Sequence, residues 1–181
     1  MAIEYLDRKT YDLARAHGYE LIGRLGTDLY YVHKTPSGRR EKLTGFMRSD
    51  GTMLFEPVFI EFSSADKDML MCRREDGLWG VVSKEGVQIT DFIYEEMDGR
   101  YEFGRLMAKR NDLWGYLDKK GEVAIPFRYE IAAPFIKRVA IVQEGGKLKA
   151  IGLRGETASD ESLAKLNAAR AAAHIPPFTM S

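Results

Sequence analysis

A repeat with a period of 35 residues runs through the middle of this 181-residue sequence. Residues 76–96, DGLWGVVSKEGVQITDFIYEE, align without gaps on residues 111–131, NDLWGYLDKKGEVAIPFRYEI. The aligned pairs include Trp79 with Trp114, Gly80 with Gly115, Gly86 with Gly121, and Tyr94 with Tyr129. Such self-similarity predicts copies of one supersecondary unit, each of which buries its apolar face against its neighbours.

Weaker copies flank these two cycles. A shift of 35 residues toward the N-terminus aligns Leu43, Gly45, Gly51 and Phe59, with Thr44 in place of the tryptophan. The same shift toward the C-terminus aligns Leu148 with Leu113, puts Lys149 and Ala150 at the Trp-Gly positions, and leaves Gly155 one residue early. We therefore expect a degenerate first copy and a truncated last copy, because the terminal repeats of such arrays are usually atypical.

Each cycle has the pattern of three strands joined by two turns. Asp76-Gly77 lies between apolar runs and favours a tight hairpin, and Gly86 and Gly121 fit the next turn, where a left-handed residue is needed. The predicted fold is mainly β, with tandem antiparallel hairpin repeats that form a twisted or partly closed sheet. Whether the repeats close into a barrel stays open at this point.

One helix is predicted at each end of the sheet. Leu6–His17 has an apolar face and ends before Gly18, and residues 160–173 are rich in strong helix formers after Ser159 as a cap. We expect a single domain over residues 1–181. Its parts are an N-terminal helix and leading hairpin (1–41), the repeats (42–156), a C-terminal helix (157–175) and a tail (176–181).

The repeated aromatic residues are predicted to form the core. Trp79 and Trp114 are interpreted as spacers between stacked repeats, and Phe59, Tyr94 and Tyr129 as core sites of successive cycles. A glycine beside each tryptophan leaves room for a backbone or an aromatic ring to approach. The alternative is that the two tryptophans form a platform on which a ligand stacks.

The Leu-Trp-Gly motif, the following Gly turn, and the segments Ile125-Pro126 and Pro134-Phe135 resemble the bacterial WG-repeat family. The resemblance covers residues 42–156; cycle two departs from it at Thr90-Asp91, and cycles one and four lack the tryptophan. It implies a chain of antiparallel hairpins that acts as an interaction module, in some cases beside bacterial toxin and immunity genes. It implies no catalytic residue.

Composition and motifs leave several classes without support. Lys and Arg total 27 and so do Asp and Glu, so no net charge supports nucleic-acid binding. No apolar run of about 20 residues predicts a membrane span, and the N-terminus lacks a secretory signal, so we expect a cytoplasmic protein. His17, His33 and His174 match no metal motif, Cys72 is interpreted as a packed thiol, and no motif predicts a cofactor. The oligomeric state stays open.

Residues 91–105, DFIYEEMDGRYEFGR, interleave carboxylates with aromatic residues. One interpretation is a surface for a basic partner protein, where charge steers the encounter and an aromatic residue anchors it. The other is a solvated connector whose aromatic residues point inward. The candidate partner-binding residues are Asp91, Glu95, Glu96, Asp98, Tyr101 and Glu102.

Two functions remain from the sequence. The first is a non-catalytic module that binds another protein, with neutralisation of a bacterial toxin by a cytoplasmic immunity protein as one version based on family resemblance. The second is a small enzyme or ligand-binding protein with an acidic cleft between hairpins. A pocket lined by acids of shifted pKa would favour the second, and a broad surface patch the first.

Overall fold

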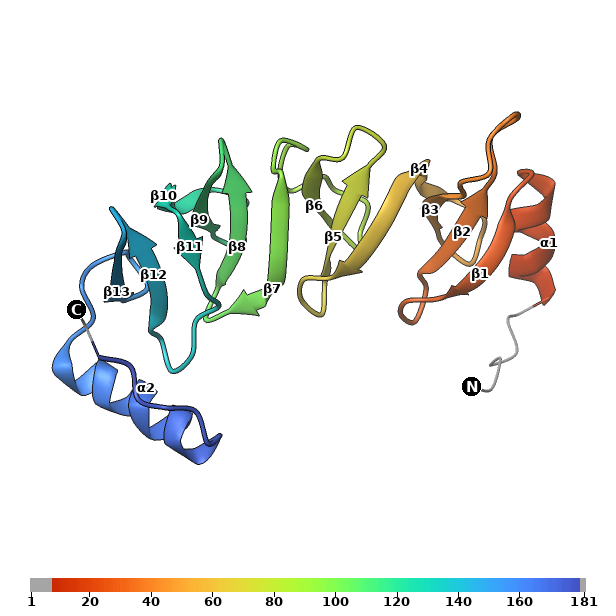
Figure 1. Cartoon of the computed structure of the whole chain (residues 1–181). Coiled ribbons are helices and arrows are strands. Elements are labelled where there is room, and N and C mark those ends of the chain that lie inside the picture. The colour runs from red at the N-terminus through yellow and green to blue at the C-terminus, as the bar shows by residue number, and fades with distance from the viewer. Residues whose placement is uncertain (1–7, 180–181) are drawn as a thin grey trace.

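The computed structural model describes residues 8–179. Within them, strands lie between two helices, α1 (Arg8–Ala16) and α2 (Asp160–Ala172), at opposite ends of an elongated molecule (Figure 1). The prediction of a mainly β fold with a helix at each end is therefore confirmed. Leu6 and Asp7, the first residues of the predicted N-terminal helix, lie outside the described residues.

The strands form three antiparallel sheets, which do not close into a barrel within residues 8–179. The first sheet contains, in order, β1 (Glu20–Arg24), β2 (Tyr30–Lys34), β3 (Leu43–Met47), β4 (Met53–Ser64), β5 (Met69–Arg74) and β6 (Trp79–Ser83). The second contains β7 (Glu96–Glu102), β8 (Arg105–Arg110), β9 (Leu113–Leu117) and β10 (Val123–Tyr129). The third contains β11 (Ile131–Ala132), β12 (Ala140–Glu144) and β13 (Lys147–Ile151).

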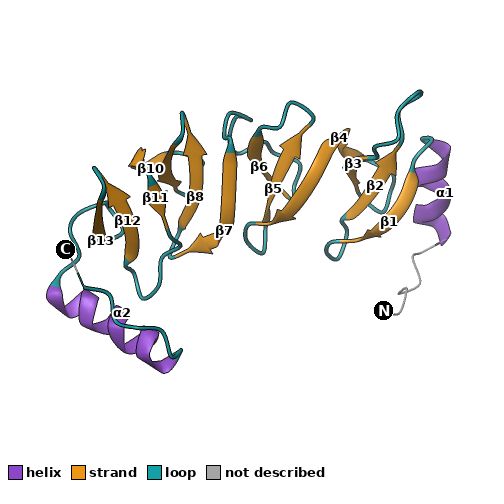
Figure 2. Cartoon of the chain, viewed as in Figure 1, coloured by secondary structure: helices purple, strands orange, loops and turns teal. Residues whose placement is uncertain are grey.

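Strand pairing divides the strands into four successive units, of which the last has only three full strands. The units follow one another along the molecule (Figure 2). β4 serves two units, because its first half pairs with β3 and its second half with β5. Unit 1 thus contains β1 to β3 and the start of β4, and unit 2 the rest of β4, β5, β6 and residues 88–94, which meet β6 through two isolated bridges. Unit 3 contains β7 to β10, and unit 4 contains β11 to β13 and Thr157, which bridges to Ile151.

The third and fourth strands pair in the same register in the first three units. The equivalent pairs are Thr44 with Phe59, Trp79 with Tyr94, and Trp114 with Tyr129. Each pair lies 35 residues after the one before it. The structure therefore places the two tryptophans at the same position of successive units.

The fourth unit has a register different from the one expected from sequence. Arg110 and Leu113 flank a two-residue turn in unit 3, and Glu144 and Lys147 flank the equivalent turn 34 residues later. Leu148 therefore occupies the position of Trp114, and the alignment of Leu148 with Leu113 was wrong by one residue. The missing residue lies in the first strand of the unit, which carries a register irregularity in β7.

Contact between units depends on an aromatic pair that recurs with the same period. The ring of Phe59 in unit 1 stacks on Phe92 in unit 2 at a centroid distance of 5.6 Å. Tyr94 in unit 2 stacks on Phe127 in unit 3 at 5.9 Å. Phe59 and Tyr94 are buried, so the two pairs remove apolar surface from water where the units meet.

A glycine in the turn between the third and fourth strands packs against the preceding unit. Each of these glycines has a positive φ, and a Cβ there would approach a neighbour at 2.4–3.4 Å. The contacts are Gly51 with Leu13 of α1, Gly86 with Leu54, Gly121 with Ile89, and Gly155 with Ile125. α1 therefore takes the place of a preceding unit at the start of the row.

The glycine after each tryptophan position makes room for an aromatic ring or a backbone. A Cβ on Gly80 would lie 2.9 Å from the ring of Phe92, and one on Gly115 would lie 2.9 Å from the ring of Phe127 and 2.8 Å from the carbonyl oxygen of Ile125. Trp79 and Trp114 themselves are half-buried. Each packs against a different one of two clusters of buried hydrophobic residues.

We expect Gly115→Ala to lower the free energy of unfolding by about 1–3 kcal/mol. The added methyl group would be too close to the Phe127 ring and the Ile125 carbonyl. Gly26→Ala is the matched control, since the nearest atom to its Cβ, in Leu29, lies 4.0 Å away. Chemical denaturation of both variants measures the difference. Equal stability of Gly115→Ala and the parent would contradict the assignment of this contact.

We expect Trp79→Ala and Trp114→Ala each to lower the melting temperature by several degrees. Removing a fully buried tryptophan typically costs about 3–5 kcal/mol, and these half-buried residues should lose somewhat less. Tyr11→Ala, on the exposed side of α1, serves as a control. Thermal melts in which both tryptophan variants match the parent would argue against a structural role.

Candidate interaction surface

One edge of the molecule collects two sets of turns from every unit. They join the first strand to the second (25–29, 65–68, 103–104, 137–138) and the third to the fourth (48–52, 84–86, 118–122, 152–156). We call this edge, at the bottom of Figure 1, the turn edge. Four antiparallel strands in sequence bring these turns to the same side, because alternate connections lie at opposite ends of the strands.

Depressions lie between neighbouring turns along this edge. One, of about 530 Å³, lies beside the start of α2 and is lined in part by Arg138, Arg154 and Ser162. Three smaller ones, of about 360–420 Å³, lie between the turns of units 1 and 2, units 2 and 3, and units 3 and 4. The repeat thus produces a row of open hollows along the turn edge.

The depression between units 3 and 4 is the most apolar of these. Phe103 is 47% exposed and Ile136 is 48% exposed, and both line the depression together with Pro134. Phe103 has a φ of 52° and the following Gly104 a φ of 76°, which together form a turn between Glu102 and Arg105. A bulky residue in the left-handed region is strained, and such outliers often mark functional positions.

One basic side chain, that of Lys137, lines this apolar depression. Lys137 and Arg138 occupy the neighbouring turn with φ values of 49° and 67°, and both are exposed. In the described part of the chain, neither forms an ion pair, and the same is true of Arg100 and Arg154. Glu102 is the acidic residue in the lining. Lys137 can therefore offer a cation at this depression without first breaking an internal salt bridge, whereas Arg100 and Arg154 line the neighbouring depressions.

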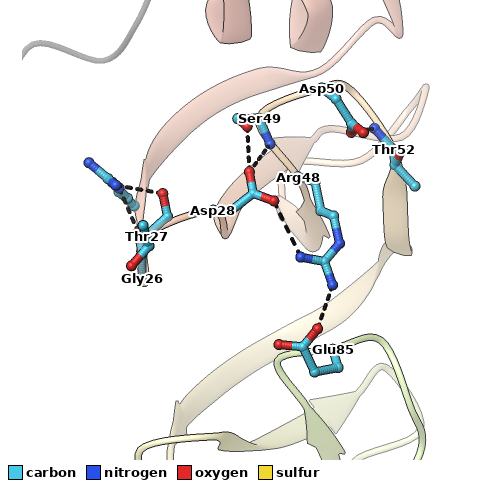
Figure 3. Close-up of polar contacts among 9 residues, drawn as sticks. Gly26, Thr27, Asp28, Arg48, Ser49, Asp50, Thr52 and Glu85 are labelled. Atoms are coloured by element: carbon cyan, nitrogen blue, oxygen red, sulfur yellow. Dashed lines mark hydrogen bonds and ion pairs between the residues drawn. The ribbon is translucent and has the colours of Figure 1, made fainter.

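At the other end of the turn edge, Arg48 joins units 1 and 2 (Figure 3). Its guanidinium lies 3.3 Å from the carboxylate of Asp28 in the same unit and 2.7 Å from that of Glu85 in the next. Asp28 also accepts hydrogen bonds from the amide of Ser49, at 3.0 Å, and from the Ser49 hydroxyl. These contacts brace adjacent turns, so three of the charges that line the hollow beside them, on Asp28, Arg48 and Glu85, are already paired.

The acidic residues predicted to bind a partner have separate surroundings. Glu95 accepts hydrogen bonds from the amides of Asn111 and Asp112, at 2.8 and 3.0 Å, and so holds the next turn. Glu96 pairs with Lys109 at 2.9 Å. Asp98 accepts a bond from the amide of Gly99, Asp91 accepts one from Gln88, and Glu102 lies at the turn edge. The structure does not gather them into one cluster.

The aromatic residues of this stretch divide between the core and the surface. Phe92 and Tyr94 are buried, and Tyr101 donates a hydrogen bond to the carbonyl oxygen of Asp118 at 3.0 Å. Burial raises the pKa of the Tyr94 and Tyr101 hydroxyls above their ordinary value. Phe103 is the exposed one, and Ile136 beside it carried no signal in the sequence because the two lie 33 residues apart.

The described residues contain little that suggests chemistry. No group of three or more His, Cys, Asp or Glu side chains among residues 8–179 is placed to hold a metal ion. Burial raises the pKa of the Cys72 thiol, which keeps it protonated. No helix in the described part of the chain has both the length and the apolar character to cross a membrane.

Comparison with known proteins identifies the repeat. Residues 114–147 match the family model of the WG containing repeat, which supports the resemblance over this stretch. The match starts at Trp114 and ends just before Leu148, which agrees with the 34-residue spacing of the last two units. No curated protein matches the chain.

Two solved structures show a loose likeness. KlHsv2 with loop 6CD replaced by a Gly-Ser linker has a TM-score of 0.42 and 10% identity, covering 77% of this chain and 49% of that one. The structure of HIRA(644-1017) has a TM-score of 0.37 and 12% identity, covering 68% of this chain and 46% of that one. The chain thus spans about half the length of each, and likenesses at this level say nothing about its function.

We expect Asp28→Asn to destabilise the protein near neutral pH. Hydrogen bonds from Ser49, with a smaller contribution from Arg48, hold the pKa of Asp28 below its usual range. This stabilisation is complete above the unfolded pKa of about 3.9 and is lost as the pH falls through the lower folded pKa. Melting temperatures of parent and variant should therefore converge in acid; a gap that persists unchanged there would contradict this role.

Proposed function

We propose that the chain is a non-catalytic protein-interaction module that binds a partner through its turn edge. The observation that carries this proposal is the apolar depression of Phe103, Pro134 and Ile136 on a row of repeated turns. Exposed apolar residues gathered at one site and bordered by charges are typical of binding surfaces. The WG-repeat β fold fits such a role, because repeat proteins use stacked units as extended binding surfaces.

Phe103 is the residue on which the binding surface depends. Its turn is of a kind that favours Asn-Gly, so a phenylalanine there gives up stability. It is also exposed, so burial does not compensate for that loss. Aromatic residues that anchor an interface supply much of its affinity. A role as such an anchor would account for a phenylalanine at this strained position.

A finer version of the proposal is a cytoplasmic immunity protein that neutralises a bacterial toxin. Its support is the association of WG-repeat proteins with toxin and immunity genes, together with the binding surface described above. A toxin gene next to the coding sequence would favour this version.

The alternative of an enzyme with an acidic cleft has less support. An acid catalyst needs a carboxyl whose pKa is raised toward neutrality. The resolved shifts of carboxyl pKa in the described residues are downward, as for Asp28, Asp66 and Glu144, because hydrogen bonds and nearby cations favour the charged form. The hollow lined by Asp28 and Glu85 also contains Arg48, which pairs with both.

We expect Phe103→Asn combined with Ile136→Thr to weaken partner binding by about tenfold or more, since an anchor residue contributes on the order of 2 kcal/mol. The asparagine should keep or raise stability, because it tolerates a positive φ better than phenylalanine does. The measurement is quantitative affinity capture from the native cell, followed by determination of Kd with the recovered protein.

The matched control is Val58→Thr combined with Ile131→Ser, which changes exposed apolar residues that are away from the turn edge. A second arm reverses the charges of Asp91, Asp98 and Glu102 and tests the acidic stretch predicted from sequence. Loss of the partner in the acidic arm and not in the Phe103 variant would move the site to that stretch. Full binding by every variant would contradict the proposal.

A further inference from the structure

The last unit lacks most of its fourth strand. In units 1 to 3 the third strand pairs with an aromatic residue of the fourth: Phe59, Tyr94 or Tyr129. In unit 4 the residue at this place, 34 after Tyr129, would be Leu163, which instead lies in α2. Only Thr157 and Ala158 lie beside β13: Thr157 bridges to Ile151, and the amide of Ala158 donates to the carbonyl oxygen of Ala150 at 2.8 Å. The chain then enters α2.

The exposure of β13 reflects this missing neighbour. Lys147, Leu148 and Lys149 are all exposed, whereas Ala150 and Ile151 beside Thr157 are buried. Leu148 is 43% exposed, although its equivalents Trp79 and Trp114 are half-buried. The first half of β13 is therefore the part of the last unit from which a strand is absent.

The backbone of Leu148 points toward the empty position. Glu144 pairs with Lys147 across the turn, and Val142 pairs with Lys149, so the amide and carbonyl of Leu148 between them face away from β12. In unit 2 the equivalent amide of Trp79 donates to the carbonyl oxygen of Tyr94 at 2.7 Å, and the amide of Tyr94 donates back at 3.3 Å. Within residues 8–179 no strand offers Leu148 such a pair.

We propose that an extended acidic segment of another protein adds to this open edge as the fourth strand of unit 4, with an aromatic residue opposite Leu148. Strand addition of this kind uses main-chain hydrogen bonds for affinity and alternate side chains for specificity. The aromatic residue follows from the three complete units, each of which has a phenylalanine or tyrosine at that place.

The acidic character follows from the lysines on either side of Leu148. Their side chains project to the face opposite that of Leu148, so they meet the residues just before and just after the aromatic one. Lys149 contacts Glu144 at 2.6 Å, and Arg128 lies 3.5 Å from the same carboxylate, which leaves an excess of positive charge. Carboxylates on both sides of the aromatic residue match this edge.

The same lysines exclude a second copy of the chain as the occupant through this edge. Edge lysines discourage pairing between like edges, because they would place like charges opposite each other. The positive charge of these lysines attracts an acidic strand and repels the same basic edge of a second copy. The inference rests on the proposed role as an interaction module, but it concerns a site separate from the Phe103 depression.

The test uses a defined peptide and the whole chain. The probe is Thr-Val-Glu-Tyr-Glu-Val-Thr, an extended peptide that omits the equivalents of Ile125 to Phe127, because Lys149 occupies the position of Gly115, where a Cβ would meet the Phe127 ring and the Ile125 carbonyl. One control peptide has lysine at both glutamate positions, and another carries an N-methyl group on the tyrosine amide, which prevents the main-chain bond. Binding is followed by NMR chemical shifts of the labelled protein and by hydrogen exchange.

We expect the acidic peptide to shift the amide resonances of Lys147 to Lys149 and to slow exchange of the Leu148 amide by about tenfold or more. Both control peptides should bind at least about tenfold more weakly. Leu148→Pro removes the outward amide without removing a bond to β12, and proline is tolerated on edge strands, so this variant should melt near the parent and lose the peptide.

Lys147→Glu combined with Lys149→Glu should reverse the preference toward the lysine peptide and so provides a second test. Equal binding of the N-methylated peptide, protection at another strand, or no saturable binding would overturn the inference. None of these results would change the outcome of the Phe103 capture experiment, so failure of this inference and failure of the proposed function are distinguishable.

Discussion

The contact between successive units is the interaction on which this fold depends. One unit contributes an aromatic residue at the end of its fourth strand, and the next contributes a phenylalanine that stacks on it, as Phe59 does with Phe92 and Tyr94 with Phe127. A single four-stranded unit has no second layer of its own to cover it, so its apolar side chains are removed from water mainly by its neighbours. The turn glycines tighten the same junction, because only a residue without Cβ fits both the positive φ and the close approach.

Much of this architecture could be predicted from the sequence because the period is carried by residues with strict backbone needs. Trp79-Gly80 and Trp114-Gly115 fixed the repeat, and the turn glycines fixed the hairpins. The register of unit 4 could not be predicted, because Lys149 and Ala150 replace the marker residues and the missing residue lies upstream in a strand without them. Nor could the sequence show that β4 serves two units, since a continuous strand and two short ones have the same alternation.

The candidate site was predicted in part. The sequence drew attention to residues 91–105, and Phe103 at the turn edge belongs to that stretch. The repeat itself held a signal that Glu95 has a structural role: Glu130, 35 residues later, accepts a hydrogen bond from the amide of Gly145 just as Glu95 holds the turn at Asn111. An acid that recurs with the period has a structural role in each unit that carries it. The apolar side chains of Phe103 and Ile136 do not recur, since the equivalent residues are Lys137 and Glu102, so they belong to a feature of two units only.

The two ends of the row are completed differently, and this asymmetry carries a physical consequence. At the start, α1 places Leu13 against Gly51, where a preceding unit would have placed its own apolar residue, so the first junction is covered. At the end, α2 packs Leu166 beside Val139 and Ala150 and covers that side of the unit, but it leaves the amide and carbonyl of Leu148 without a strand. A helix can cover side chains, yet it cannot supply the row of main-chain groups that an open strand requires. At this end, the apolar side chains are therefore covered, whereas the amide and carbonyl of Leu148 have no strand of the described chain as a hydrogen-bond partner. An added strand could supply that partner.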